Sequence, residues 1–291
     1  MASLDDLRKR IVSVKSTQKI TKAMKMVAAA KLRKAQESAE RGRPYCEKMQ
    51  NIILNLTESI SDLLNAPKLL VGNGKEQTHL CVVMTSDRGL CGGFNSNICR
   101  LAKNYFLKIL KEGKTLKIIT IGSKGHDQLK REYKKYIINK LSFKDKKKIS
   151  FSEADEVGKI ILDLFEKNDF DKCILFYNNF KNVITQIPQA QQIIPAEKKD
   201  SSPNNDEIFY EFEPDEDEIL EDLLPKNIST QIFKAFLENS ASEQGSRMTA
   251  MDNATRNAGD LVKNLTIVYN RSRQAAITKE LIEIISGAES L

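Results

Sequence analysis

Residues 251–275 read MDNATRNAGDLVKNLTIVYNRSRQA, and apolar or small side chains recur in this stretch at alternating intervals of three and four residues. A stripe this narrow is typical of a coiled-coil helix, whereas a helix on a globular core has a wider apolar face. After a shift of phase the repeat continues almost to the C-terminus, which predicts one long helix. The repeat consists of Met251, Ala254, Ala258, Leu261, Leu265, Val268, Ser272 and Ala275, then Ile277, Leu281, Ile284 and Ala288.

A stripe of the same kind lies at the opposite end of the chain. Its members are Leu4, Leu7, Ile11 and Val14, then Ile20, Met24 and Val27, and finally Met49, Ile53, Leu56, Ile60 and Leu63. At 1.5 Å per residue, a helix over residues 4–64 would be about 90 Å long. Neither narrow stripe buries itself alone, so we predict that the two terminal helices pair in an antiparallel coiled coil. Pro44 and Pro225 are the positions where a kink would interrupt them.

The segment between the helices has a different pattern, in which short apolar runs alternate with helical periodicity. The apolar runs at residues 80–84, 116–121 and 173–177 are typical of buried strands, and helical patterns cover residues 98–109 and 157–165. Strands that alternate with helices predict a mostly parallel, Rossmann-like sheet domain.

The predicted fold class is therefore α/β, with a coiled coil formed by the two chain ends. The predicted domains are an N-terminal helix at residues 1–66, the α/β domain at 67–212 and a C-terminal helix at 213–291. Within the α/β domain, residues 208–212 are predicted to form a last strand, and the basic stretch 130–148 is predicted to lie at the surface.

Cysteine and histidine usage argues against metal and disulfide chemistry. The five cysteines are an odd number without CxxC spacing, and the chain has only two histidines. We therefore expect no metal site and no disulfide framework. No apolar run approaches the roughly 18 residues of a transmembrane helix, and the N-terminus lacks the apolar core of a signal peptide.

The net charge of +7 is unevenly distributed along the chain. Residues 8–34 contain ten basic residues and no acidic one, while residues 206–222 contain ten acidic residues and no basic one. The basic segment suits nucleic acid, anionic lipid or an acidic protein surface, and equally a solvated helix face. The segment has almost no aromatic residues for base stacking, which argues against nucleic-acid binding.

Three stretches are specific enough to indicate a family. They read ITKAMKMVAAAK at residues 20–31, SDRGLCGGFN at 86–95 and RQAAITKELIEIISGA at 273–288, the last preceded by ASEQGSRMTAM at 241–251. In order and spacing the chain resembles the gamma subunit of F-type ATP synthases over its whole length, most strongly in the two terminal helices. The cysteine pair inserted in plant-plastid members of that family is absent from the sequence.

The resemblance implies a non-catalytic rotor shaft, which couples ion-driven rotation of a membrane ring to ATP synthesis in a proton-translocating complex and regulates ATPase activity. It implies one copy per complex, with no catalytic residue and no cofactor in this chain. The implied partners are the alpha and beta subunits of the catalytic head, an epsilon subunit and the c-ring, without nucleic acid. The implied location is peripheral, at the cytoplasmic face of a bacterial inner membrane or the matrix side of a mitochondrial inner membrane.

The resemblance also implies contacts with the head subunits in both terminal helices and in the 86–95 stretch. The C-terminal apolar residues would serve as a bearing, and the lysines around Met24 would face acidic loops, since opposite charge attracts without fixing one register. The expected contact residues are Lys19, Ile20, Thr21, Lys22, Met24, Lys25, Asp87, Arg88, Arg273, Gln274, Ile277, Thr278, Glu280, Leu281, Ile284 and Ala288.

An alternative function places a nucleotide site in the 86–95 stretch. Its glycines follow a predicted strand and precede a predicted helix, where glycine-rich loops cradle phosphate. The stretch nevertheless lacks the GxGxxG and GK[ST] spacings, and a nucleophilic Cys91 would need a neighbouring base. We therefore interpret it as a tight strand-to-helix turn and keep a nucleotide-binding α/β enzyme, or a nucleic-acid-binding protein, as the alternative.

Overall fold

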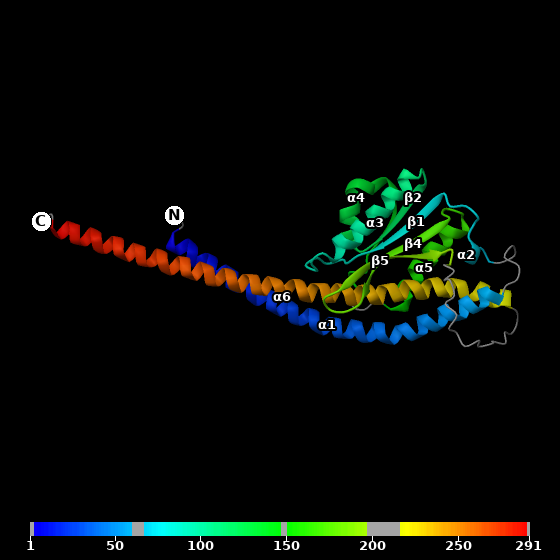
Figure 1. The fold of residues 1–291 in the computed structure, drawn as a ribbon, viewed down its shortest axis with the longest axis horizontal. Helices are drawn as coiled ribbons and strands as arrows, with labels where there is room; N and C mark the ends of the chain where they lie inside the picture. The colour runs from blue at the N-terminus through cyan, green and yellow to red at the C-terminus, as the bar shows by residue number, and fades with distance from the viewer. Residues whose placement is uncertain (1–2, 60–66, 147–149, 197–215, 290–291) are drawn as a thin grey trace. The chain divides into compact units, whose positions relative to one another are not determined.

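The computed structural model describes residues 3–59, 67–146, 150–196 and 216–289, and its longest elements are the two terminal helices (Figure 1). Helix α1 runs over Leu4–Ser59 and helix α6 over Glu216–Glu289. Both pass through their proline without interruption, since Pro44 lies inside α1 and Pro225 inside α6. The predicted strand at residues 208–212 lies outside the described residues.

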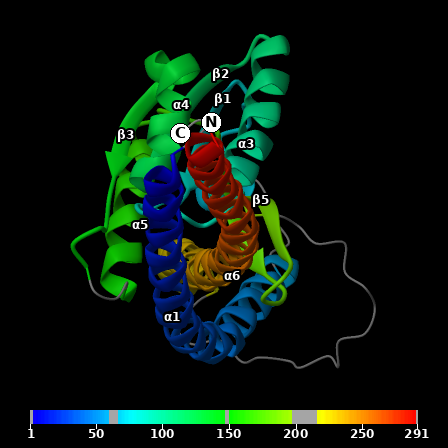
Figure 2. The same ribbon diagram turned by 90° about the vertical axis from the view of Figure 1, so that its left-hand side faces the viewer.

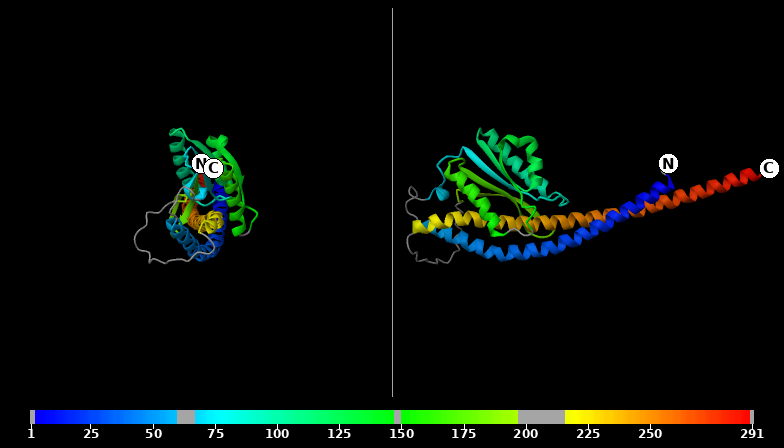
Figure 3. Two further views of the ribbon diagram at one scale, coloured as in Figure 1. Left: turned by 90° about the vertical axis from the view of Figure 1, so that its right-hand side faces the viewer. Right: turned by 180° about the vertical axis from the view of Figure 1, so that it is seen from behind.

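The chain divides into two compact units, and each terminal helix contributes to both. The first unit combines Met1–Ala30 with Arg247–Leu291, and the second comprises Lys31–Ser246. In both units α1 and α6 run side by side in opposite directions (Figures 2 and 3). The antiparallel pairing predicted from the two stripes is therefore confirmed. The predicted domain boundaries at 66 and 212 remain a prediction.

The second unit contains a five-stranded sheet in the order β3-β2-β1-β4-β5. The strands are β1 (Thr78–Met84), β2 (Thr115–Ile121), β3 (Ile137–Leu141), β4 (Lys172–Phe180) and β5 (Gln186–Ile194). The first four are mutually parallel, and only β5 runs antiparallel, beside β4. The mostly parallel α/β fold predicted from the apolar runs is confirmed.

Helices cover both faces of this sheet. The shorter ones are α2 (Lys68–Val71), α3 (Phe94–Lys111), α4 (Ser123–Tyr133), the 3-10 turn η1 (Lys134–Tyr136) and α5 (Phe151–Glu166). One apolar core joins the sheet to α3 and α4, with Phe106 fully buried in it, and a second core joins the opposite face to α5 and α6, with Ile232 fully buried. Figure 1 shows α3 and α4 on one side of the sheet and α6 on the other.

Helix α5 begins at a capping box whose carboxylate is almost completely buried. Ser150 donates its backbone N–H, at 2.8 Å, and its hydroxyl to Glu153, which also pairs with Lys146 at 3.1 Å. These hydrogen bonds stabilise the ionised carboxylate and lower the pKa of Glu153 from its ordinary 4.5 to about 2, and the bonds from Ser150 contribute most.

The lowered pKa of Glu153 predicts a defined loss of stability in acid. A carboxyl whose pKa is lower in the folded state stabilises that state fully above its unfolded pKa, and the contribution disappears as pH falls through the folded pKa. Glu153→Gln should therefore lower the unfolding free energy at pH 7 but flatten its decline between about pH 4.5 and pH 2. Urea unfolding across this range measures the effect. Glu156→Gln, which removes an exposed carboxylate from the same helix, should leave the decline unchanged.

Candidate partner-contact surfaces

In the first unit, the buried side of α1 follows an unbroken heptad repeat. From Leu7 onward, buried or half-buried side chains recur at intervals of four and three residues. In this unit the seam consists of Leu7, Ile11, Val14, Gln18, Thr21, Lys25 and Ala28, and the repeat continues along α1 at Leu32 of the second unit. The sequence-based placement of Ile20 and Val27 in the seam is wrong, because their side chains are 58% and 56% exposed. The sequence-based assignment chose the nearest apolar residue at each step. The helix instead keeps the regular heptad spacing, even where this places a polar residue in the seam.

Helix α6 shows the same one-position error. Its buried or half-buried side is formed by Met251, Thr255, Ala258, Val262, Leu265, Tyr269, Ser272 and Ala276. The predicted seam positions Leu261, Val268 and Ala275 are therefore each displaced by one residue, and their side chains are exposed, whereas the predicted Ala254 is half buried beside Thr255. Leu261 and Val268 are 47% and 48% exposed.

The middle of the seam is held by polar contacts. The hydroxyls of Thr21 and Thr255 lie 2.8 Å apart, and Gln18 donates from Nε2 to the carbonyl of Thr255 at 3.5 Å. Lys25 Nζ lies 2.5 Å from a carboxylate oxygen of Asp252. Lys25 and then Arg256, which also pairs with Asp252, lower the pKa of that carboxyl. Polar contacts of this kind fix the register of a coiled coil at some loss of stability.

The outward faces of the first unit carry an unusual number of exposed apolar side chains. From Ile277 to Ala288 every side chain is exposed, and Figure 1 shows that this end of α6 extends beyond the start of α1. Clusters of exposed apolar side chains are typical of binding surfaces, so this end of α6 is a candidate for partner contact. The large exposed apolar residues of this unit are Val12, Ile20, Met26, Val27, Leu261, Ile267, Val268, Ile277, Leu281, Ile282, Ile284 and Ile285.

The structure places the expected contact residues of the terminal helices in two different environments. Thr21, Met24 and Lys25 are half buried, the first and last of them through the polar contacts of the seam. All the others have exposed side chains, namely Lys19, Ile20, Lys22, Arg273, Gln274, Ile277, Thr278, Glu280, Leu281, Ile284 and Ala288. Their contact role stays a prediction. The sequence analysis did not single out the exposed Val12, Met26, Ile267 and Ile282. Each is an apolar residue that lies outside the heptad positions of the seam, which is the signal that could have identified it.

In the second unit, the 86–95 stretch folds as a turn from β1 to α3. The side chain of Asn95 accepts the backbone N–H of Ser86 at 2.9 Å and donates to its hydroxyl at 2.8 Å. Cys91 is only 2% exposed and lies against both side chains, 3.3 Å from Asn95 Nδ2 and 3.6 Å from Ser86 Oγ. These contacts build the tight strand-to-helix turn inferred from the sequence.

Asp87 uses its carboxylate to bind neighbouring elements of its own domain. One oxygen accepts the backbone N–H of Ser123 and the hydroxyl of Ser142, each at 2.8 Å, and the other accepts the N–H of Phe143 at 3.3 Å. Arg88, the next residue, has an exposed side chain. Of the two expected contact residues in this loop, Arg88 is thus the better placed to meet a partner.

The described residues contain neither a membrane-spanning helix nor a metal-ligand cluster. No helix among them is long and apolar enough to cross a membrane. In the same part of the chain, no group of three or more histidine, cysteine, aspartate or glutamate side chains is arranged to hold a metal ion.

Comparison with known proteins gives relatives that span the whole chain. The family described as ATP synthase matches residues 3–291. A protein named ATP synthase gamma chain from Pelagibacter ubique (strain HTCC1062) is 73% identical over 291 residues and covers 100% of both chains. Its namesake from Rhizobium etli (strain CIAT 652) is 55% identical over 294 residues, again over 100% of both chains.

Solved structures show the same fold. A chain in the central stalk and c-ring structure of the Tetrahymena thermophila mitochondrial ATP synthase is 26% identical, with a TM-score of 0.61 and coverage of 81% of this chain and 99% of that one. A chain in the OSCP, F1 and c-ring structure of the Euglena gracilis mitochondrial ATP synthase is 20% identical. It has a TM-score of 0.69 and covers 99% of this chain and 94% of that one.

Proposed function

The chain belongs to the family of ATP synthase gamma chains and is a non-catalytic subunit of the central stalk, and we propose that its first unit is the end of the stalk that turns inside the catalytic head. The observation that carries this proposal is the exposed apolar surface of α6 from Ile277 to Ala288. Such a surface needs a partner, and apolar contact is non-directional. Head subunits that surround this apolar end of α6 would therefore hold the stalk without fixing it at one rotational angle.

Charge on α1 supports contact with an acidic partner. Lys19 and Lys22 are exposed, and the basic segment 8–34 that contains them has no acidic residue of its own. Lys25 contributes less, because its charge is paired with Asp252. Charge complementarity attracts over several ångströms and tolerates rotation, so this face suits acidic loops that meet the shaft at some angles and release it at others.

The remaining assembly follows from the same proposal. One copy of the chain would bind the alpha and beta subunits of the head, the epsilon subunit and the c-ring, with protons as the driving ion. The complex would lie at the cytoplasmic face of a bacterial inner membrane. The bacterial origin of the gamma chains from Pelagibacter ubique and Rhizobium etli supports this location. The structures from Tetrahymena and Euglena, which contain the c-ring, support the ring as a partner.

Met24→Lys tests the placement of the head contact on α1. Met24 is half buried and lies beside the polar seam positions Thr21 and Lys25 without belonging to the seam, so a lysine there adds a charge beside the proposed partner without removing a core residue. We expect assembly to survive, with one chain per ATP-hydrolysing head. We also expect fewer ions to be pumped per ATP hydrolysed in membrane vesicles.

Asn51→Lys is the matched control, because it adds the same charge to an exposed position of α1 in the second unit. It should leave the pumping ratio at the wild-type value. If Met24→Lys also kept that ratio, Met24 would not lie at the head contact. If the wild-type chain failed to co-purify with the head, the proposed function itself would be wrong.

A further inference from the structure

Strand β4 continues beyond the point where its neighbour β1 stops pairing with it. The last paired residues are Val83 of β1 and Phe176 of β4, whereas β4 extends to Phe180. On its other edge, β4 remains paired with β5 up to Phe180 and Gln186. Among the described strands, none pairs with Asn178 and Phe180 on the β1 side.

Side chains from the two long helices take the place of that strand. The N–H of Asn178 donates to Asn239 at 3.2 Å, and the hydroxyl of Ser242 donates to the carbonyl of Asn178 at 3.2 Å. The N–H of Phe180 donates to Glu238 at 3.1 Å, and Arg43 Nη2 donates to the carbonyl of Phe180 at 3.3 Å. The four bonds satisfy the N–H and C=O of both residues, as a neighbouring strand would.

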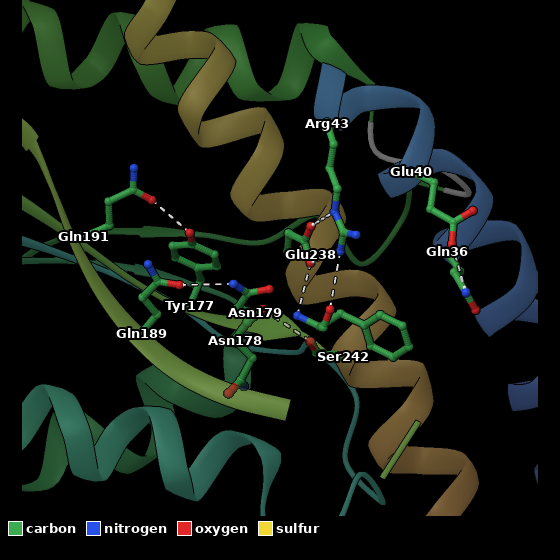
Figure 4. Close-up of polar contacts among 11 residues, drawn as sticks. Gln36, Glu40, Arg43, Tyr177, Asn178, Asn179, Gln189, Gln191, Glu238 and Ser242 are labelled. Atoms are coloured by element: carbon green, nitrogen blue, oxygen red, sulfur yellow. Dashed lines mark hydrogen bonds and ion pairs between the residues drawn. The ribbon is translucent and has the colours of Figure 1, made fainter. Parts of the chain in front are cut away.

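Arg43 and Glu238 also bind each other with two hydrogen bonds. Arg43 Nε lies 2.8 Å from one carboxylate oxygen of Glu238, and Nη2 lies 3.2 Å from the other (Figure 4). The Glu238 side chain is 4% exposed and that of Arg43 is 38% exposed. The bond to Glu238 raises the pKa of Arg43. Since Arg43 belongs to α1 and Glu238 to α6, one forked pair ties both helices to the end of β4.

We propose that Arg43, Glu238, Asn239 and Ser242 form a torque-bearing clamp between the α/β domain and the two long helices. The inference rests on the proposed rotor function. Apolar contacts between the sheet and α6, such as those of Ile232 and Phe236, hold the layers together but do not fix direction. Charge-assisted hydrogen bonds have fixed geometry, so the clamp resists sliding of the helices along the sheet. Its members on α6, Glu238, Asn239 and Ser242, lie shortly before Arg247, the residue at which α6 passes into the first unit.

The test compares clamp variants in the assembled complex in membrane vesicles. Arg43→Gln removes the charge and the fork, and Glu238→Gln keeps the shape of the side chain but removes the charge. Both should leave ATP hydrolysis by the detergent-solubilised complex unchanged, because no torque acts against a gradient there. The steady-state ion gradient should fall by roughly two-fold or more, the size expected for one contact in a coupling network. Arg43→Lys, which retains the charge, should restore part of the gradient.

Ile232→Ala is the matched control for stability alone. Ile232 is fully buried between the same sheet and α6, so this variant weakens the same interface without touching the clamp. It should lower the melting temperature but keep the wild-type gradient per assembled complex. If Arg43→Gln and Glu238→Gln behaved like Ile232→Ala, the clamp would be structural only and the inference would be overturned. A wild-type complex that failed to couple hydrolysis to pumping would instead overturn the proposed function.

Discussion

Replacing Gly122 by alanine is expected to destabilise the α/β domain by about 3 kcal/mol or more, because it combines backbone strain with a backbone clash. Gly122 has φ of +93°, and a Cβ built on it would lie 2.3 Å from the carbonyl oxygen of Thr85 and 2.7 Å from its carbon. The same two loops are joined by the N–H of Thr85, which donates to Ile121 at 2.8 Å. Separating them to admit a methyl group would break this bond at the end of the sheet.

Gly113→Ala separates the two causes. Gly113 also has positive φ, +71°, but a Cβ there would meet no atom within 4 Å, so only the strain of roughly 1–2 kcal/mol remains. Urea unfolding of the full chain, followed by near-ultraviolet circular dichroism, measures both variants. Tyr105, Tyr133 and Tyr177 of the second unit report on its packing. Equal losses for the two variants would show that the close approach to Thr85 costs nothing.

The sequence predicts the central strands better than the edge strands. Strands β1, β2 and β4 are buried on both faces and therefore appear as continuous apolar runs. Strand β3 alternates half-buried and exposed residues, and it lies in a stretch that the sequence marked only as basic surface. Strand β5 is an edge strand that contains Pro188 and four glutamines. Edge strands bury too little to leave a clear apolar pattern.

The terminal helices show what a stripe of apolar residues does and does not establish. It predicted both helices and their pairing, because the heptad repeat is present at each end. It misplaced Leu261, Val268 and Ala275 in α6, because these apolar residues are adjacent to the true positions Val262, Tyr269 and Ala276. Ile20, Val27, Leu261 and Val268 were placed in the seam because they are apolar, although their side chains are exposed.

The clamp had no signal in the sequence. Arg43 and Glu238 are 195 residues apart, and neither departs from the pattern of an ordinary charged residue on a long helix. The missing strand beside Asn178 depends on where β1 stops pairing, which the apolar run at residues 80–84 does not specify. Such a site becomes visible only once the register of the sheet is known.

Removing one partner of the clamp is expected to cost up to about 3 kcal/mol of unfolding free energy, less than for a fully buried pair because the Arg43 side chain is partly solvated. The two single variants should differ. Arg43→Met leaves the carboxylate of Glu238, 4% exposed, without its cation, whereas after Glu238→Leu the 38% exposed Arg43 retains access to solvent. Arg43→Met should therefore be the more destabilising, with Glu238→Leu toward the lower end because solvent screens the remaining charge. Urea unfolding of both variants measures this order. Lys226→Met, in the exposed pair with Asp222, is the control and should change little.

The double variant Arg43→Met with Glu238→Leu separates stability from torque. Replacing both members of a buried ion pair by apolar side chains is often neutral or stabilising, so the double variant should be more stable than either single one. It still leaves the N–H and carbonyl of Phe180 without their side-chain partners, and it has no directional bond between α1, α6 and β4. A double variant that regains stability but not the ion gradient would show that the charges act in transmission of torque. A double variant that regains both the stability and the ion gradient would show that apolar packing between the sheet and the helices is sufficient to transmit torque.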